Sequence, residues 1–234
     1  MKHFRVHLYF YMNVTTLHES WSKRDADAVF QEITRRALFQ TSFDASGIWS
    51  AWQNALRDAC RTSKQKGDVF ERLCVAYMRE VAHMSECWLL EEIPQDVREA
   101  LALRKSDFGI DIVCRDAQGN YHAAQAKFRS RTGARKVFVP WRELSTFDAL
   151  CQRSGPYSKY WVLTSADGIR RVGRRSAHDK SVCAQSWAKL GTEFWTRCAK
   201  LEGTRLGSEE IDNHACTRAL TMEELRAKRL ARLE

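Results

Sequence analysis

Apolar residues recur at helical spacing in the N-terminal part of the chain. In residues 25–40 and 46–61 this spacing predicts two amphipathic helices. The run SKQKGD at residues 63–68 interrupts the pattern, and a third helix is predicted over residues 68–82. Asp68 is the expected N-cap of this third helix, because an aspartate side chain accepts hydrogen bonds from the first helical N–H groups.

Farther along, short apolar runs predict strands. CWLLEEIP at residues 87–94 predicts a strand ended by its proline, and residues 95–105 are expected to form a short helix or a loop. The next elements expected are a hairpin over residues 107–128 around a turn at 116–120, a helix over 140–155 and a strand over 159–166 buried on both faces. Helices are also predicted at residues 186–201 and at 221–234.

This order of elements predicts a mixed α/β fold, in which a central sheet of about four strands is flanked by helices. Three parts of the chain are expected. Residues 1–65 form an N-terminal helical extension, residues 66–200 form the domain that contains the sheet, and residues 201–234 form a C-terminal tail with a terminal helix.

Composition and charge restrict the class of protein. The 234 residues are 44% hydrophobic and 29% charged, as in ordinary globular proteins, and the net charge of +9 favours a polyanionic partner such as nucleic acid. No apolar stretch approaches the ~20 residues of a membrane span, and no signal-peptide cleavage site follows the N-terminal apolar patch. The eight cysteines include no CxxC pair, which favours buried free thiols over a zinc site. We therefore expect a cytoplasmic protein with no membrane association.

Three polar side chains stand out in the apolar hairpin: Asp111, Gln125 and Lys127. If the turn comprises residues 116–120, Arg115 pairs with Tyr121, and counting back along both strands sets Asp111 opposite Gln125. Directly opposed Cβ atoms lie ~5 Å apart, and Lys127 shares the face of Gln125 because side chains alternate along a strand. One face of the hairpin is then expected to be aliphatic core, while the other gathers a carboxylate, an amide oxygen and an ammonium group.

These three groups suit metal-assisted hydrolysis of a phosphodiester. Mg²⁺ prefers oxygen ligands, and a bound Mg²⁺ (or Mn²⁺ as a substitute) polarises a phosphate and acidifies a water molecule. A lysine can orient that water or neutralise charge that develops on the phosphoryl oxygens. The site needs another acid from a different element, and Glu71 on the third predicted helix is the candidate.

At these residues the sequence resembles the PD-(D/E)xK nuclease superfamily and, within it, the Mrr-like restriction endonucleases. The resemblance rests on KGDVFERLC with Glu71, DFGIDIVCRD with Asp111, and HAAQAKF with Gln125 and Lys127, and it extends over residues 66–190. It implies a restriction-endonuclease-like fold in which Asp111 and Gln125 bind the metal, Lys127 assists the attacking water and Glu71 completes the acidic site. The glutamine departs from the general D/E pattern of the superfamily but fits the Mrr-like subset.

Two basic runs flank these motifs, at residues 127–136 and 169–180. Lysine and arginine there can bind phosphates in a salt-dependent, sequence-independent way. The candidate nucleic-acid-binding residues are Arg129, Arg131, Arg135, Lys136, Arg170, Arg171, Arg174 and Arg175.

The predicted function is a Mg²⁺-dependent endonuclease that hydrolyses DNA in restriction or mobile-element defence. A separately encoded helicase or methyltransferase and a second copy of the chain, as a homodimer, are the expected protein partners. Two other functions stay open: a catalytically silent DNA-binding module of a larger assembly, and an RNA or junction nuclease on the same fold.

The site residues also have structural alternatives. Glu71 is the third helical residue after Asp68, and the two could form a capping box with no catalytic role. Asp111 and Lys127 could form an ordinary cross-strand ion pair on a solvated face of the sheet.

Overall fold

The computed structural model describes residues 21–41, 47–104, 109–130, 135–170 and 179–200. The predicted terminal helix and the tail over residues 201–234 lie outside these ranges. The described chain forms two compact units: a first unit up to Arg72 together with residues 190–200, and a second unit from Leu73 to Lys189. Within the same ranges, no helix has the length and apolar character that crossing a bilayer requires.

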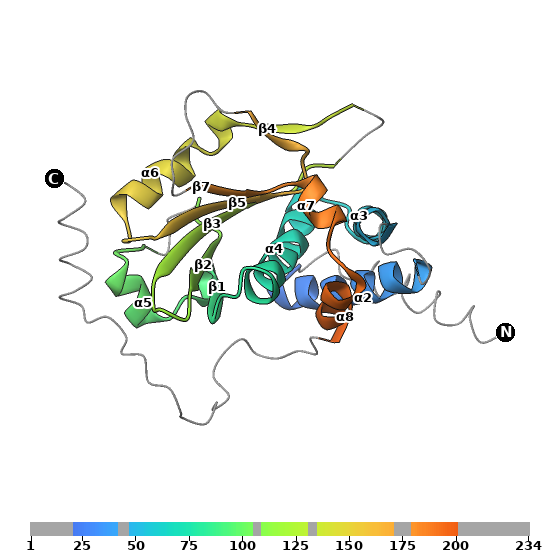
Figure 1. The fold of residues 1–234 in the computed structure, drawn as a ribbon, viewed down its shortest axis with the longest axis horizontal. Helices are drawn as coiled ribbons and strands as arrows, with labels where there is room; N and C mark the ends of the chain where they lie inside the picture. The colour runs from blue at the N-terminus through green and yellow to red at the C-terminus, as the bar shows by residue number, and fades with distance from the viewer. Residues whose placement is uncertain (1–20, 42–46, 105–108, 131–134, 171–178, 201–234) are drawn as a thin grey trace. The chain divides into compact units, whose positions relative to one another are not determined.

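The first unit consists of α2 (Lys23–Gln40), α3 (Ile48–Ala59), the beginning of α4 (Ser63–Glu80), and α8 (Thr192–Lys200). The predicted helices at residues 25–40 and 46–61 are therefore confirmed. α2 and α8 pack side by side, as Figure 1 shows. Large aromatic side chains make up much of the core: Phe30, Trp49, Trp52, Phe194 and Trp195.

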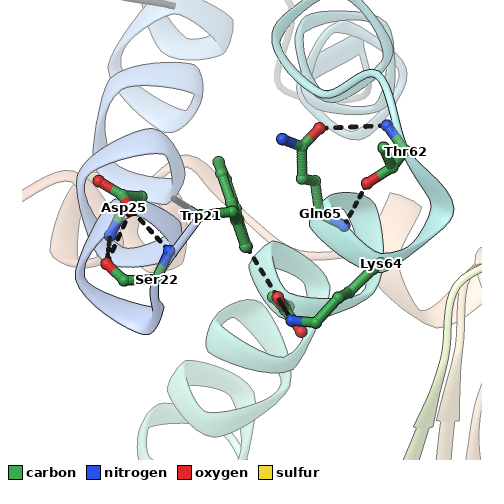
Figure 2. A network of polar contacts seen from close by, with 7 residues as sticks. Trp21, Ser22, Asp25, Thr62, Lys64 and Gln65 are labelled. Atoms are coloured by element: carbon green, nitrogen blue, oxygen red, sulfur yellow. Dashed lines mark hydrogen bonds and ion pairs between the residues drawn. The ribbon is translucent and has the colours of Figure 1, made fainter. Parts of the chain in front are cut away.

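The third helix begins earlier than the sequence pattern predicts. α4 starts at Ser63, and the residue before it, Thr62, caps it. The Gln65 backbone N–H donates to Thr62 Oγ1 at 3.1 Å, and the Thr62 backbone N–H donates to Gln65 Oε1 at 3.1 Å (Figure 2). This reciprocal pair is a capping box, so the run SKQKGD is the first turn and a half of the helix and not an interruption.

Asp68 is consequently not an N-cap, and that prediction was wrong. Its carboxylate accepts a hydrogen bond from Trp21 Nε1 at 2.8 Å and lies 2.7 Å from Lys64 Nζ, one helical turn earlier. Figure 2 shows Trp21, which lies just before α2, and Lys64 of α4, whose side chains both reach this carboxylate. The polar character of SKQKGD therefore reflects these contacts and a solvated helix face.

The second unit is built on a mixed sheet of five strands, one more than predicted. The strands, in spatial order, are β1 (Glu86–Leu89), β2 (Ile112–Arg115), β3 (Tyr121–Lys127), β5 (Lys159–Thr164) and β7 (Asp179–Val182). β1, β2 and β3 are antiparallel neighbours, whereas β3, β5 and β7 run parallel. Two further strands, β4 (Phe138–Pro140) and β6 (Gly168–Arg170), pair in a separate parallel ribbon (Figure 1).

The sheet carries a hydrophobic core that includes residues of α5 (Gln95–Ala100) and α6 (Ser145–Arg153). Val113, Ala123 and Val162 contribute from neighbouring strands to this core, which also includes Val97 of α5 and Phe147 of α6. The remaining short elements are the 3-10 helices at Leu90–Glu92 and Trp141–Glu143, and α7 (Ala184–Ala188).

The opposite side of the sheet is also covered. The part of α4 that belongs to the second unit contacts β1 through a hydrogen bond from Arg79 Nη2 to the Cys87 carbonyl at 3.0 Å, and Tyr77 packs edge-on against Trp187 of α7. Ile112 and Cys114 of β2 have no exposed surface. The cysteines within the described ranges are free thiols, buried except for the half-buried Cys183, as the sequence predicts.

Other elements differ from prediction at their ends. The first strand stops at Leu89 because the chain enters a 3-10 turn before Pro94. The helix expected over residues 186–201 is two helices, α7 and α8, with Leu190 and Gly191 between them. α8 packs in the first unit, so the compact units differ from the predicted boundaries at residues 65 and 200. The functional domain division stays a prediction.

Substitution of Gly67 tests where α4 begins. Gly67 lies inside the helix, and an added Cβ would meet nothing within 4 Å. Gly67→Ala should therefore raise the free energy of unfolding by ~0.5–1 kcal/mol, because alanine loses less conformational freedom on entering a helix. Urea denaturation followed by circular dichroism measures the change. An unchanged or lower stability would mean that the helix starts after this residue.

Candidate active site

The hairpin has the predicted register. Arg115 pairs with Tyr121, and regular pairing of β2 with β3 continues back to Ile112 opposite Ala124. Asp111 lies one residue beyond this ladder. Its backbone N–H donates to the Ala124 carbonyl at 3.0 Å, and its carboxylate Oδ2 accepts the Ala126 N–H at 2.8 Å. These two bonds bracket Gln125, so the carboxylate is held beside the part of β3 that carries the other two polar residues.

One further hydrogen bond holds Asp111 in place, and a glycine allows the chain to approach it. On the β1 side, the Leu90 N–H donates to the Asp111 carbonyl at 2.9 Å. Two residues before Asp111, Gly109 has a φ of 150°, and a Cβ there would lie 3.0 Å from Leu150 Cδ1 of α6. A glycine is therefore required where the chain passes close to α6 and enters β2.

Gln125 is buried, with 3% of its surface exposed, and its Oε1 has no hydrogen-bond partner among the described residues. An unsatisfied buried carbonyl oxygen costs ~1–3 kcal/mol, which is unusual in a well-packed sheet. Such an atom is available to a ligand that the chain itself does not supply.

Lys127 ends β3 and lies opposite Thr164, the last residue of β5. Its backbone carbonyl accepts hydrogen bonds from Thr164 Oγ1 at 2.6 Å and from the Ser165 N–H at 3.3 Å. Lys127 is half-buried. The structure thus brings Asp111, Gln125 and Lys127 to the same end of the β2–β3 pair.

The faces of the hairpin differ from prediction. Val113 and Ala123, which share the face of Gln125, have no exposed surface and belong to the core with α5 and α6. Both faces are therefore buried, and the prediction of one polar face was wrong for most of its length. The polar residues occupy only the end of that face. A solvated sheet face is excluded for Gln125 by its burial.

Glu71 lies on α4, in the first unit and half-buried. Because the capping box belongs to Thr62 and Gln65, Glu71 is eight residues inside the helix and the capping alternative is wrong. Its role as the additional acid stays a prediction. Among the described residues, no group of three or more His, Cys, Asp or Glu side chains could hold a metal ion.

Asp111 and Gln125 nevertheless fit a hard divalent cation. Both offer oxygen atoms, one a carboxylate and one a buried amide oxygen without a partner in the described chain. Mg²⁺ is commonly held by one or two carboxylates and keeps several water molecules, so two oxygen ligands from the protein are enough for a Mg²⁺ site.

The basic residues fall into three groups. Arg129 forms an ion pair with Glu143, which offsets its positive charge. Arg135 and Lys136 are exposed just before β4, and Arg170 is exposed at the end of β6 with its guanidinium 5.0 Å from the centre of the Phe138 ring. Arg131, Arg171, Arg174 and Arg175 lie outside the described residues.

The turn that sets the register is held by Asp116. Its Oδ1 accepts the backbone N–H groups of Gln118 at 3.0 Å and Asn120 at 2.8 Å, and its Oδ2 lies 3.0 Å from Nε2 of the buried His122. Partial burial acts to raise the pKa of Asp116, but the hydrogen bonds from His122 and Asn120 together outweigh it and lower this pKa below its ordinary value.

Comparison with known families agrees with this geometry. Residues 78–185 match a family model described as restriction endonuclease, of the Mrr catalytic type. No curated protein and no solved structure matches the chain. The matched segment includes Asp111, Gln125 and Lys127 but begins after Glu71. The match over residues 78–185 is consistent with an Mrr-like restriction endonuclease domain, whose fold is a mixed sheet flanked by helices, and it supports a nuclease function.

Acid should remove the contribution of Asp116 to stability. Because its folded pKa is depressed, the charged carboxylate stabilises the native state fully above the unfolded carboxyl pKa of ~3.9. This contribution is lost as the pH falls through the lower folded value. The stability difference between the wild type and Asp116→Asn, measured by urea denaturation, should be constant near neutral pH and shrink below about pH 4. A difference that grows on acidification would contradict the assigned pKa direction.

Proposed function

We propose that this protein is a divalent-metal-dependent endonuclease that hydrolyses phosphodiester bonds of DNA. The observation that carries the proposal is the buried Gln125 oxygen without a partner in the described chain, next to the anchored carboxylate of Asp111 and two residues from Lys127. The family match to restriction endonucleases over the same residues supports the reaction class and DNA as the substrate.

In this proposal Asp111 and Gln125 hold the metal ion. When bound there, Mg²⁺ or Mn²⁺ would supply polarisation of a phosphate oxygen and a water molecule of lowered pKa. Asp111 is suited to holding it because three backbone hydrogen bonds restrain the residue, which leaves little to reorganise on binding. The amide of Gln125 adds an oxygen without adding a second negative charge.

The ammonium group of Lys127 is the catalytic cation in this proposal. Its ammonium group can donate hydrogen bonds to the attacking water or to phosphoryl oxygens on which negative charge develops. A half-buried position strengthens this interaction, since charges interact more strongly where bulk water is partly excluded. Glu71 is proposed as the additional acid, on the resemblance of its helix motif.

The exposed cations Arg135, Lys136 and Arg170 are proposed to contact DNA phosphates beside the reaction. The proposed setting is restriction or mobile-element defence. A separately encoded helicase or methyltransferase, and a second copy of the chain, are the partners expected there.

Loss of either charged group should abolish cleavage. Lys127→Ala and Asp111→Asn should each slow nicking of supercoiled plasmid in Mg²⁺ by ~10²-fold or more, because each removes a group that acts in the transition state. Asparagine keeps an oxygen for the Ala126 N–H, so the Asp111→Asn protein should remain folded. A chelator should stop the wild-type reaction.

Matched controls separate site chemistry from loss of charge. Lys189→Ala removes an exposed lysine at the end of α7, and Asp96→Asn removes an exposed carboxylate of α5. Both should cleave at the wild-type rate under conditions where they are folded. Cleavage by Lys127→Ala at that rate would refute the site. A wild type that binds DNA but leaves plasmid intact with Mg²⁺ and Mn²⁺ would favour a silent DNA-binding module.

Gln125 gives a test that needs no cleavage. Gln125→Leu removes the unsatisfied oxygen at similar volume, so without metal the protein should be as stable as the wild type or more stable by ~1 kcal/mol. Mg²⁺ or Mn²⁺ at about a hundred times its Kd should stabilise the wild type by ~2.7 kcal/mol. We expect little stabilisation of Gln125→Leu in thermal denaturation. Gln185→Leu, an exposed glutamine of α7, should behave like the wild type. Equal stabilisation of both variants would exclude Gln125 as a ligand.

A further inference from the structure

Two hydroxyl groups at the end of β5 hold the end of β3. Thr164 Oγ1 donates to the Lys127 carbonyl at 2.6 Å and accepts the Ala166 N–H at 3.1 Å. The hydroxyl of the next residue, Ser165, accepts the Arg129 N–H at 2.6 Å and donates to the Arg129 carbonyl at 3.0 Å. Regular pairing of β3 with β5 ends at Lys127 opposite Thr164. The two side chains therefore continue the attachment beyond the point where the ladder stops.

The hydroxyl of Thr164 makes the closer contact to Lys127. The Lys127 carbonyl also accepts the Ser165 N–H, but at 3.3 Å this bond is weaker than the 2.6 Å bond from Thr164 Oγ1. Thr164 has no exposed surface. A buried hydroxyl is costly unless it is hydrogen-bonded, and valine would fit a buried strand without that cost. A threonine at this position is thus accounted for by the two hydrogen bonds of its hydroxyl, of which the shorter is the bond to the Lys127 carbonyl.

Thr164 is itself held from the other side. Trp187 of α7, which is fully buried, donates from Nε1 to the Thr164 carbonyl at 2.8 Å. At the first residue of α7, the Ala184 N–H donates to the Ala166 carbonyl at 2.8 Å. The segment of Thr164 to Ala166 therefore has little freedom to move, and its hydrogen bonds to Lys127 and Arg129 restrain the end of β3.

We propose that Thr164 is a positioning residue for Lys127: its hydroxyl restrains the backbone from which the lysine side chain extends. This inference rests on the proposed function, since it takes Lys127 as the catalytic cation. The four-carbon side chain of a lysine is flexible, so the position of its backbone decides which atoms the ammonium group reaches. A displacement of ~1 Å at a catalytic group can cost ~10²-fold in rate.

The first unit offers a matched control. Thr34 of α2 is also fully buried, donates to a backbone carbonyl (Phe30) at 2.6 Å and accepts an N–H (Trp52 Nε1) at 3.1 Å. Thr34→Val and Thr164→Val therefore each remove a buried hydroxyl that donates one hydrogen bond to a backbone carbonyl and accepts one from an N–H group. A structural role alone predicts similar effects of the two substitutions on stability and on activity per folded molecule.

The experiment compares full-length wild type, Thr164→Val, Thr164→Ser and Thr34→Val in plasmid cleavage with Mg²⁺, corrected for the folded fraction. We expect Thr164→Val to lower kcat by ~10-fold or more with less than about a two-fold change in KM for DNA. Thr164→Ser, which keeps the hydroxyl, should restore kcat to within about three-fold of the wild type. Thr34→Val should retain the wild-type kcat. Equal kcat values for the two valine variants, or a serine variant as slow as Thr164→Val, would overturn the inference.

Amide hydrogen exchange gives a second readout that is independent of activity. Exchange at Phe128 and Arg129 should accelerate by ~10-fold or more in Thr164→Val and stay at the wild-type rate in Thr34→Val. Unchanged exchange in Thr164→Val would overturn the inference whatever the kinetics. A wild type that cleaves no DNA with any divalent metal would instead refute the proposed function and, with it, the catalytic part of the inference. Cleavage that is lost in Lys127→Ala but normal in Thr164→Val would refute the inference alone.

Discussion

Hydrogen bonding of β3 along both of its edges is the constraint on which the candidate site depends. One edge pairs antiparallel with β2, and the other pairs parallel with β5. Because side chains alternate along a strand, a slip of one residue on either edge would send Gln125 and Lys127 to the wrong face. The turn at Asp116 sets the register on one edge, and the contacts of Thr164 and Ser165 hold the end of the strand on the other.

The polar groups of the site occupy a place where an ordinary sheet would be apolar. Val113, Ala123 and Val162 form a tightly packed core on the same face, and the unsatisfied oxygen of Gln125 lies at its end. That oxygen has no partner in the described chain, so the native state is less stable than it would be with a well-packed apolar residue at this position. Such local costs are typical of functional sites, where the surrounding structure over-determines the geometry. Here the surrounding structure is the triple anchoring of Asp111 and the buried hydroxyl of Thr164.

The first unit is held together differently. Its helices meet through stacked and edge-on aromatic rings, with Trp49, Trp52 and Trp195 within 6.4 Å of one another by ring centres. Side chains at the helix starts satisfy backbone N–H groups that have no partner within the helix, as Ser22 does for α2 and Thr62 for α4. None of these contacts involves Asp111, Gln125 or Lys127. They stabilise the helices of the unit to which Glu71 belongs.

The sequence by itself determined four of the five strands of the main sheet and the hairpin register, because turn residues and period-two alternation are local properties. Arg115 pairs with Tyr121 as predicted, and the family motifs at Asp111, Gln125 and Lys127 can be recognised from the sequence alone. The start of α4 is also encoded locally, since Thr62 and Gln65 form a capping box. Asp68 and Glu71 have the same spacing, however, and the sequence alone did not show which pair caps the helix.

Only the tertiary structure decided what surrounds these residues. The burial of both hairpin faces depends on α5 and α6, which come from distant parts of the chain. The same is true of the bond from Thr164 to Lys127, since 37 residues separate the two. A buried threonine looks in the sequence like any strand residue, and an amide looks the same with or without a hydrogen-bond partner. Whether such a group is satisfied depends on atoms brought near it by folding, and no local pattern encodes them.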